Sequence, residues 1–130
     1  MQRSAVFMAV VILLNAVASA AEPKVVPLED IAQHVGEQVA VEMVVQSSRM
    51  LESGKFCFLN SKKSYTDKDN FTVSIRGAAL REFAAKEIED PAEYYLKKKI
   101  RVRGKVTLYK EKPQIVVDSP EQIVMIVVIE

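Results

Sequence analysis

Cysteine and histidine are almost absent from this sequence of 130 residues, which contains one of each, Cys57 and His34. A single cysteine excludes an internal disulfide, and the pair is too few for a metal cluster of the Cys/His type. The neighbours of Cys57 favour a buried thiol over an intermolecular partner. His34 is expected at a helix end, where an imidazole complements the helix dipole. We therefore expect no metal and no other cofactor.

Sequence motifs of catalysis are also missing. The chain has no P-loop, no dinucleotide-binding fingerprint and no metal-binding motif. Acid–base or nucleophilic catalysis requires a base beside a nucleophile, or paired carboxylates in a pocket. Nothing in the expected fold brings His34 and Cys57 together, and the acidic residues between positions 82 and 93 are typical of a solvated helix face. The sequence therefore predicts a binding protein and not an enzyme.

The N-terminal residues have the features of a secretory signal peptide. Arg3 precedes an apolar run over residues 5–14, and Ala18-Ser19-Ala20 is a small-x-small cleavage pattern. The apolar run is too short for a convincing membrane span, although an uncleaved N-terminal anchor is the alternative. We expect cleavage after Ala20, a secreted or periplasmic location, and one domain over residues 21–130.

Charge is balanced once the signal segment is removed. Without Arg3, 17 basic residues face 17 acidic ones, whereas strong nucleic-acid binders are usually basic overall. The distribution is uneven, because eight basic residues and four acidic ones follow position 96. A neutral chain can thus still carry a basic stripe.

Alternating apolar and polar residues predict five strands. The clearest alternation covers residues 100–108, with a glycine that marks a bend or a close backbone approach. A polar turn over residues 110–113 and a return strand over residues 114–117 follow. The earlier strands are predicted over residues 38–46, 55–60 and 71–76. The residues expected to face inward are Val39, Val41, Met43, Val45, Phe71, Val73, Ile75, Ile100, Val102, Gly104, Val106 and Leu108.

Two helical segments accompany these strands. Residues 28–35 place Leu28, Ile31 and Val35 on one face of a short amphipathic helix. Residues 80–96 carry a second apolar stripe, and Pro91 ends or restarts that helix. Residues 47–54 and 61–70 are expected to be loops, and Ser119 before Pro120 predicts a helix or turn start.

The order of these elements, with the phrase IRVRGKVTLY at residues 100–109 and PQI at 113–115, resembles the OB-fold nucleic-acid-binding superfamily. In particular it is similar to small OB modules of exported bacterial proteins, over roughly residues 35–123. The resemblance implies an all-β fold with capping helices: a five-stranded Greek-key barrel with a helix between strands 3 and 4. OB folds bind single-stranded nucleic acid, oligosaccharides or proteins, so the fold alone does not choose a ligand.

The second predicted strand carries a more specific likeness. Anticodon-binding OB domains have an aromatic residue that stacks on an unpaired base, with a polar residue two places on, and Phe58 and Asn60 are similar. In this interpretation Phe58 faces outward. The alternative, which we favour from the sequence, places Phe56 and Phe58 in the core and Cys57 and Leu59 under a loop.

The leading hypothesis is weak, sequence-independent binding of single-stranded DNA or RNA. Phe58 would stack on a base, Asn60 would bond to a base or sugar, and Tyr65 and Tyr109 are optional stacking residues. Phosphate contacts are predicted for Lys55, Lys62, Lys63, Arg76, Lys110 and Lys112.

The other hypothesis is a protein-interaction or assembly module of the cell envelope. A final apolar segment begins at Ile123 and ends at Ile129, too short to span a bilayer. It is expected to form a buried strand, or an edge strand that pairs with another copy or a protein partner. An oligosaccharide or small-ligand binder is a further alternative, supported only by the fold.

Overall fold

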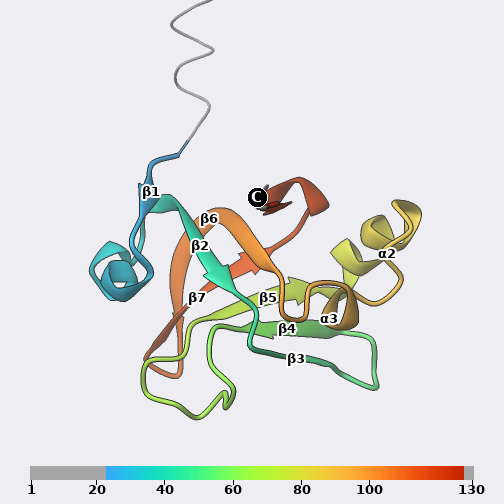
Figure 1. The fold of residues 1–130 in the computed structure, drawn as a ribbon, viewed down its shortest axis with the longest axis horizontal. Helices are drawn as coiled ribbons and strands as arrows, with labels where there is room; N and C mark the ends of the chain where they lie inside the picture. Colours follow the sequence, from blue (N-terminus) through green and yellow to red (C-terminus); the bar gives the residue numbers. More distant parts are fainter. Residues whose placement is uncertain (1–22, 128–130) are drawn as a thin grey trace, which may run out of the picture.

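The computed structural model describes residues 23–127, which form mostly strands with a few short helices (Figure 1). The expected signal segment over residues 1–20 and the last residues of the final apolar segment lie outside the described residues. The strands are β1 (Val25–Val26), β2 (Gln38–Val44), β3 (Ser47–Met50), β4 (Phe56–Asn60), β5 (Thr72–Arg76), β6 (Lys99–Tyr109), β7 (Lys112–Val117) and β8 (Ile123–Met125). The helices are η1 (Leu28–His34), α2 (Gly77–Ala85), α3 (Pro91–Tyr94) and η2 (Pro120–Gln122).

The strands form one mixed sheet in the order β1-β2-β6-β7-β5-β4-β3, and β8 pairs with β6 beside this path. Neighbours pair antiparallel except β1 with β2 and β5 with β7, which are parallel. Only Val45 and Gln46 separate β2 from β3 in the chain, although these strands stand far apart in the pairing order. The prediction of an all-β fold with a few helices is confirmed.

The strands predicted from strict alternation of apolar and polar residues are present in the structure. Val39, Val41, Met43 and Val45 are all buried, as are Phe71, Val73 and Ile75. In β6 the expected inward residues Ile100, Val102 and Val106 are fully buried. Leu108 was wrongly placed inward, because 54% of its surface is exposed where β6 enters the hairpin with β7.

The helices differ from the prediction in type and length. η1 is a 3₁₀ helix that buries Ile31, and Val35 follows its end with 41% of its surface exposed. The second helical segment divides into α2 and α3, which lie together at one side of the molecule (Figure 1). Pro91 begins α3, and the Asp90 carboxylate caps it by accepting hydrogen bonds from the amides of Ala92 and Glu93. As predicted, helical residues connect the third and fourth predicted strands, which are β5 and β6.

Residues 47–54 are not a loop throughout, which corrects the prediction. Ser47–Met50 forms β3, which pairs antiparallel with β4 and gives it a second neighbour. The residues of β3 are half-buried or exposed, and their sequence shows no apolar alternation. Pairing with β4, and not a sequence pattern, therefore makes this segment a strand.

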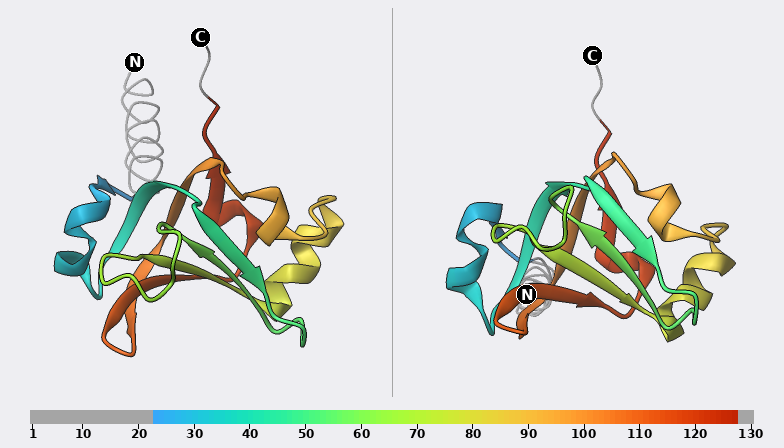
Figure 2. Two further views of the ribbon diagram at one scale, coloured as in Figure 1. Left: turned by 60° about the horizontal axis from the view of Figure 1, so that its bottom comes forward. Right: turned by 90° about the horizontal axis from the view of Figure 1, so that it is seen from below.

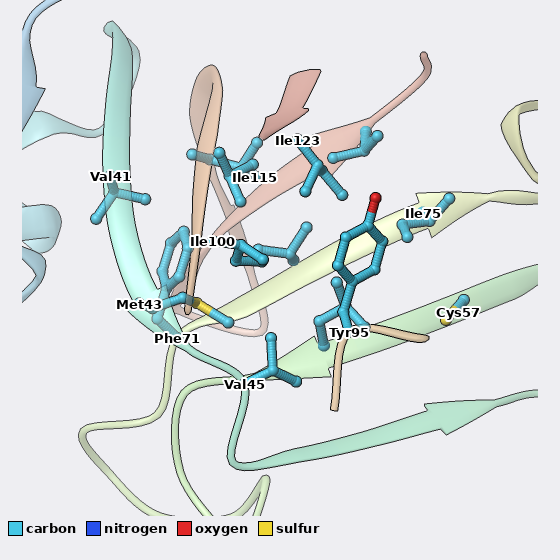
Figure 3. Close-up of a cluster of buried hydrophobic side chains, with 14 of the residues drawn as sticks. Val41, Met43, Val45, Cys57, Phe71, Ile75, Tyr95, Ile100, Ile115 and Ile123 are labelled. Carbon is cyan, nitrogen blue, oxygen red and sulfur yellow. The ribbon is translucent and has the colours of Figure 1, made fainter. Parts of the chain in front are cut away.

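The core gathers aliphatic side chains from both halves of the sheet (Figure 3). Phe83 of α2 and Tyr95 after α3 close it beside the helices, their rings packed edge to face with centroids 6.3 Å apart. Cys57 and Leu59 are fully buried in it. The prediction of a buried Cys57 thiol is therefore confirmed.

β8 continues the core beyond η2. Ile123 to Met125 pair antiparallel with Val102 to Ile100 of β6, and Ile123 is buried. The chain after β8 is less covered, since Val127 is 74% exposed. The final apolar segment thus forms a strand within this chain over its first three residues. Within residues 23–127, no helix is both long and apolar enough to cross a membrane.

β6 is strongly curved (Figure 1), and its pairing partner changes just after Gly104: residues 99–105 pair with β2 and residues 106–109 with β7. A Cβ atom at position 104 would lie 2.7 Å from the Cγ2 atom of Ile115 and 3.2 Å from the Nε2 atom of Gln122. The Ile115 branch methyl is fully buried and close to its backbone, so it has little freedom to move away. The contacts that exclude a side chain at this glycine thus come from the side chains of Ile115 and Gln122, while the nearest backbone atom, the Val116 carbonyl oxygen, would lie 3.9 Å away.

We expect Gly104→Ala to lower the free energy of unfolding by about 1–3 kcal/mol, because overpacking forces neighbouring atoms to shift. Urea denaturation measures this loss. Ile115→Leu moves the branch methyl away from position 104, so the double variant should lose less than the sum of the two single losses. Strict additivity would show that the Ile115 contact is not the cause.

Stability should fall at alkaline pH because two buried acids hold their protons. Burial raises the pKa of the Cys57 thiol from 9.0 to about 12, and the nearby Asp90 carboxylate adds to the shift. Burial also raises the pKa of the Tyr95 phenol from 10.0 to about 12, with a smaller contribution from Tyr94. Between pH 9 and pH 12 these two groups are partly deprotonated in the unfolded chain but still protonated in the native one. Their contribution to the free energy of unfolding is therefore fully present below pH 9 and is lost as the pH rises toward 12.

Urea midpoints measured from pH 8 to 11.5 test this prediction. Cys57→Ala removes the contribution of the thiol and leaves that of Tyr95, so its midpoint should decline less steeply above pH 9. Equal slopes for the two proteins would contradict the thiol contribution.

Candidate nucleic-acid interface

A groove of about 380 Å³ lies on the outer face of the sheet, across β4, β5 and β7. The core-facing residues of these strands alternate with the residues that form the groove, so each strand supplies every second side chain to it. The groove is lined by Arg49, Phe58, Asn60, Tyr65, Thr72, Ser74, Tyr109, Lys110, Lys112, Pro113 and Gln114.

Phe58 faces this groove and not the core, which corrects the orientation favoured from the sequence. Cys57 and Leu59 are fully buried, whereas Phe58 is half-buried and Phe56 is 37% exposed. The two phenyl rings stack on the outer face, with centroids 5.9 Å apart and planes 4° from parallel. In the register of the sheet Phe58 lies between Arg49 of β3 and Ser74 of β5. An aromatic ring is therefore available beside a guanidinium group and a hydroxyl group.

Two chain segments flank the groove: the β6–β7 hairpin and the loop over residues 61–70. They lie at the same end of the molecule, away from α2 (Figures 1 and 2). The Lys112 Nζ atom donates a hydrogen bond of 3.4 Å to the Tyr65 carbonyl oxygen and so connects them. Tyr65 and Tyr109 are 67% and 61% exposed, and the Lys110 Nζ atom lies 5.5 Å from the centre of the Tyr109 ring.

The hairpin turn has an unusual backbone for its sequence. Lys110 and Glu111 both have positive φ angles, 50° and 67°, and neither is glycine. Turns of this kind match the twist of the strands that they join. The turn thus holds Tyr109, Lys110 and Lys112 at the rim of the groove.

A buried polar network closes the loop over residues 61–70. Asn60 Oδ1 accepts hydrogen bonds from Asn70 Nδ2 (3.2 Å) and Thr72 Oγ1 (2.9 Å). Asn70 Oδ1 accepts one from the Lys62 amide (3.1 Å), and Ser61 Oγ accepts one from the Phe71 amide (2.9 Å). Asn60 is 6% exposed. Its carbonyl oxygen is thus occupied within the protein, so the base or sugar contact predicted for this residue would have to come from its Nδ2 group.

Six of the ten predicted site residues line this one groove: Phe58, Asn60, Tyr65, Tyr109, Lys110 and Lys112. The other four do not. Lys62 and Lys63 are exposed in the flanking loop, Lys55 lies beside the start of α2, and Arg76 pairs with Asp118 at 3.4 Å outside the groove.

The prediction missed Arg49, Thr72, Ser74, Pro113 and Gln114 as site residues. The sequence does not indicate Arg49, because no apolar alternation marks its strand. Thr72 and Ser74 alternate with the residues predicted to face inward, but the sequence gives no signal that Gln114 of β7 lies beside them. Ser74 Oγ donates a hydrogen bond of 3.0 Å to Gln114 Oε1.

The groove combines aromatic rings with positive charge. Its lining contains Arg49, Lys110 and Lys112 and no carboxylate, and no ion pair occupies these three cations within the described part of the chain. Phe58 supplies a flat apolar surface in the same lining, beside Arg49 in the register of the sheet. Such a site can bind a flat ring and an anionic group together.

Asn70→Ala should loosen the loop, because it removes the amide that links Lys62, Asn60 and Thr72. We expect faster tryptic cleavage after Lys62, Lys63 and Lys68, and a loss of about 1–2 kcal/mol in the free energy of unfolding. Limited proteolysis read by mass spectrometry measures the first effect. Ser64→Ala, which removes only exposed hydrogen bonds within the loop, is the matched control. Equal cleavage rates in the two variants would contradict the role of Asn70.

Comparison with known proteins gives a likeness of fold. No protein-family model and no curated sequence matches this chain. A solved structure described as an aspartyl-tRNA synthetase from Leishmania major Friedlin is similar to it, with a TM-score of 0.51 and 13% sequence identity. The match covers 81% of this chain and 21% of that chain. This chain therefore spans about a fifth of the synthetase, and the likeness is consistent with an OB-like fold.

Proposed function

We propose that this chain is an exported OB-fold protein that binds single-stranded nucleic acid weakly and without sequence preference, in the groove centred on Phe58. The observation that carries the proposal is the meeting of one stacking ring, two exposed tyrosines and three cations in a groove without a carboxylate. Stacking and phosphate contacts of this kind accept any base, because every base has a flat face and every nucleotide a phosphate.

The order of strand pairing supports a five-stranded barrel. β2 and β3 follow one another with two residues between them, so we treat them as one bent strand. The path β2-β6-β7-β5-β4-β3 then begins and ends on that strand and includes four others. The parallel pairing of β5 with β7 and the helices between β5 and β6 fit the same arrangement.

The name of the similar structure adds weak support. An aspartyl-tRNA synthetase is named for a nucleic-acid substrate, and the similar region includes most of this chain. At 13% identity this likeness extends to the fold alone. The proposed ligand is therefore argued from the chemistry of the groove.

We propose binding without catalysis. The groove is lined by no histidine, cysteine or carboxylate, and the Ser74 hydroxyl is bonded to Gln114. Cys57 lies on the opposite face of β4, buried, with its pKa raised to about 12. Export is supported by the apolar segment that ends in Ala18-Ser19-Ala20.

Fluorescence anisotropy of a labelled oligothymidine and an oligouridine tests the proposal on the chain that begins at Ala21. Phe58→Ala should weaken binding by about 5- to 150-fold, because base–aromatic stacking contributes about 1–3 kcal/mol per base. Tyr94→Ala is the matched control, since Tyr94 is a 45% exposed aromatic residue on α3 that does not line the groove. Its affinity should equal that of the unchanged protein.

The salt dependence separates this function from its alternatives. If Arg49, Lys110 and Lys112 each contact a phosphate, a plot of the logarithm of the affinity against the logarithm of the salt concentration should have a slope of about −2. Absence of binding at low salt would contradict the proposal. A concentration-dependent dimer that persists in salt would then favour an assembly role for the segment that begins at Ile123.

A further inference from the structure

A second hollow, of about 780 Å³, lies beside the first one on the outer face of the sheet. It is lined by Pro23, Gln38, Arg76, Arg103, Gly104, Lys105, Thr107, Gln114, Val116, Asp118 and Gln122. Gln114 belongs to both linings, so the hollow and the groove adjoin at this residue.

The register of the sheet forms a continuous polar path between them. Ser47, Asn60, Thr72, Gln114 and Thr107 are successive partners across β3, β4, β5, β7 and β6. Adjacent strands are about 4.8 Å apart, so the three strand steps from Asn60 to Thr107 cover about 14 Å. The path carries side-chain hydroxyl and amide groups from the Phe58 groove to the bend of β6.

Cations at the end of this path lack acidic partners. On the outer face of β6, Arg101 pairs with Glu42 at 2.7 Å and Lys99 lies 4.0 Å from the same carboxylate. Arg103 and Lys105 lie opposite Ala40 and Gln38 of β2, so neither residue directly across from them carries a carboxylate. Neither of them forms an ion pair among residues 23–127.

The floor of the hollow is held in place by Gln122. Its Nε2 atom donates hydrogen bonds to the carbonyl oxygens of Arg103 (3.0 Å) and Val116 (3.3 Å). Its Oε1 atom accepts from the amides of Asp118 (2.8 Å) and Ser119 (3.1 Å). The single acid of the lining, Asp118, pairs with Arg76 at 3.4 Å. The lining therefore keeps a net positive charge, at Arg103 and Lys105, on a fixed backbone.

We infer that the basic hollow, with Arg103 and Lys105 as phosphate-binding residues, continues the nucleic-acid path, so that one strand occupies the Phe58 groove and the hollow together. This inference rests on the proposed function. No aromatic residue lines the hollow, so it binds the sugar–phosphate backbone and not the bases. The groove thus stacks bases at one end of the path, and the hollow holds phosphates at the other.

Oligonucleotide length tests the inference. Sites on OB folds range from about 4 to 16 nucleotides, so we would compare a thymidine dinucleotide, which is too short to reach from Phe58 to the hollow, with an oligothymidine of about 12 nucleotides by anisotropy. The unchanged protein should bind the longer one more tightly and with a steeper salt dependence. The double variant Arg103→Gln/Lys105→Gln should bind the short one normally and lose most of the advantage of the long one. Its salt slope for the long one should shrink by about 1.4, or 0.7 for each lost phosphate contact.

A matched control removes the same two residue types elsewhere. Arg81→Gln/Lys98→Gln takes one arginine and one lysine from exposed positions that line neither hollow. This control should keep the length dependence, and thermal unfolding would verify that both double variants are folded.

The outcomes distinguish the two proposals. If the Arg103→Gln/Lys105→Gln protein binds both lengths like the unchanged protein, the extended path is wrong while the groove proposal stands. If both double variants lose affinity equally, the effect is one of net charge, which also overturns the extended path. If the unchanged protein binds neither length at low salt, the proposed function fails and the extended path fails with it.

Discussion

The close approach of β6 and β7 at Gly104 is the constraint on which the rest of the molecule depends. β6 pairs with β2 along its first half and with β7 along its second, so it must turn between two directions of the sheet. Ile115 occupies the space that a side chain at position 104 would need. The same bend lets Gln122 reach the backbone of Arg103 and Val116. The core and the outer face are thus fixed by the same few atoms.

The two faces of each strand have different surroundings. Leu59, Val73 and Ile115 are buried on the inner face, while Phe58, Thr72 and Gln114, their neighbours in sequence, line the groove. Because the side-chain period of a strand is two, a change of register by one residue would exchange these sets completely. The Asn60–Asn70–Thr72 network opposes such a shift, since its hydrogen bonds form only in the present register.

Sequence patterns predicted the strands whose apolar residues alternate strictly, and failed where neighbouring strands decide. Both faces of Phe56–Asn60 carry apolar side chains, so alternation could not tell which face is buried; Cys57 and Leu59 meet the core and Phe58 does not. β3 has no apolar pattern and becomes a strand through its pairing with β4. The groove residues of the β6–β7 hairpin could be predicted because the last two predicted strands resemble those of OB folds. Arg49 and Gln114 reach it through long-range pairing, which no local pattern reveals.

The parallel pairing of β5 with β7 governs the order in which the chain can fold. During synthesis β2 cannot pair with β6, its only long partner, until β6 has been made. Likewise β5 lacks its second neighbour until β7 has been made. These partners are separated by the helices and by more than thirty positions of sequence. Strands that depend on distant partners form late, because the loops between them must be closed before pairing stabilises them. The nascent chain therefore carries β4, with its stacked phenyl rings, as part of an incomplete sheet until almost all of the domain has been made.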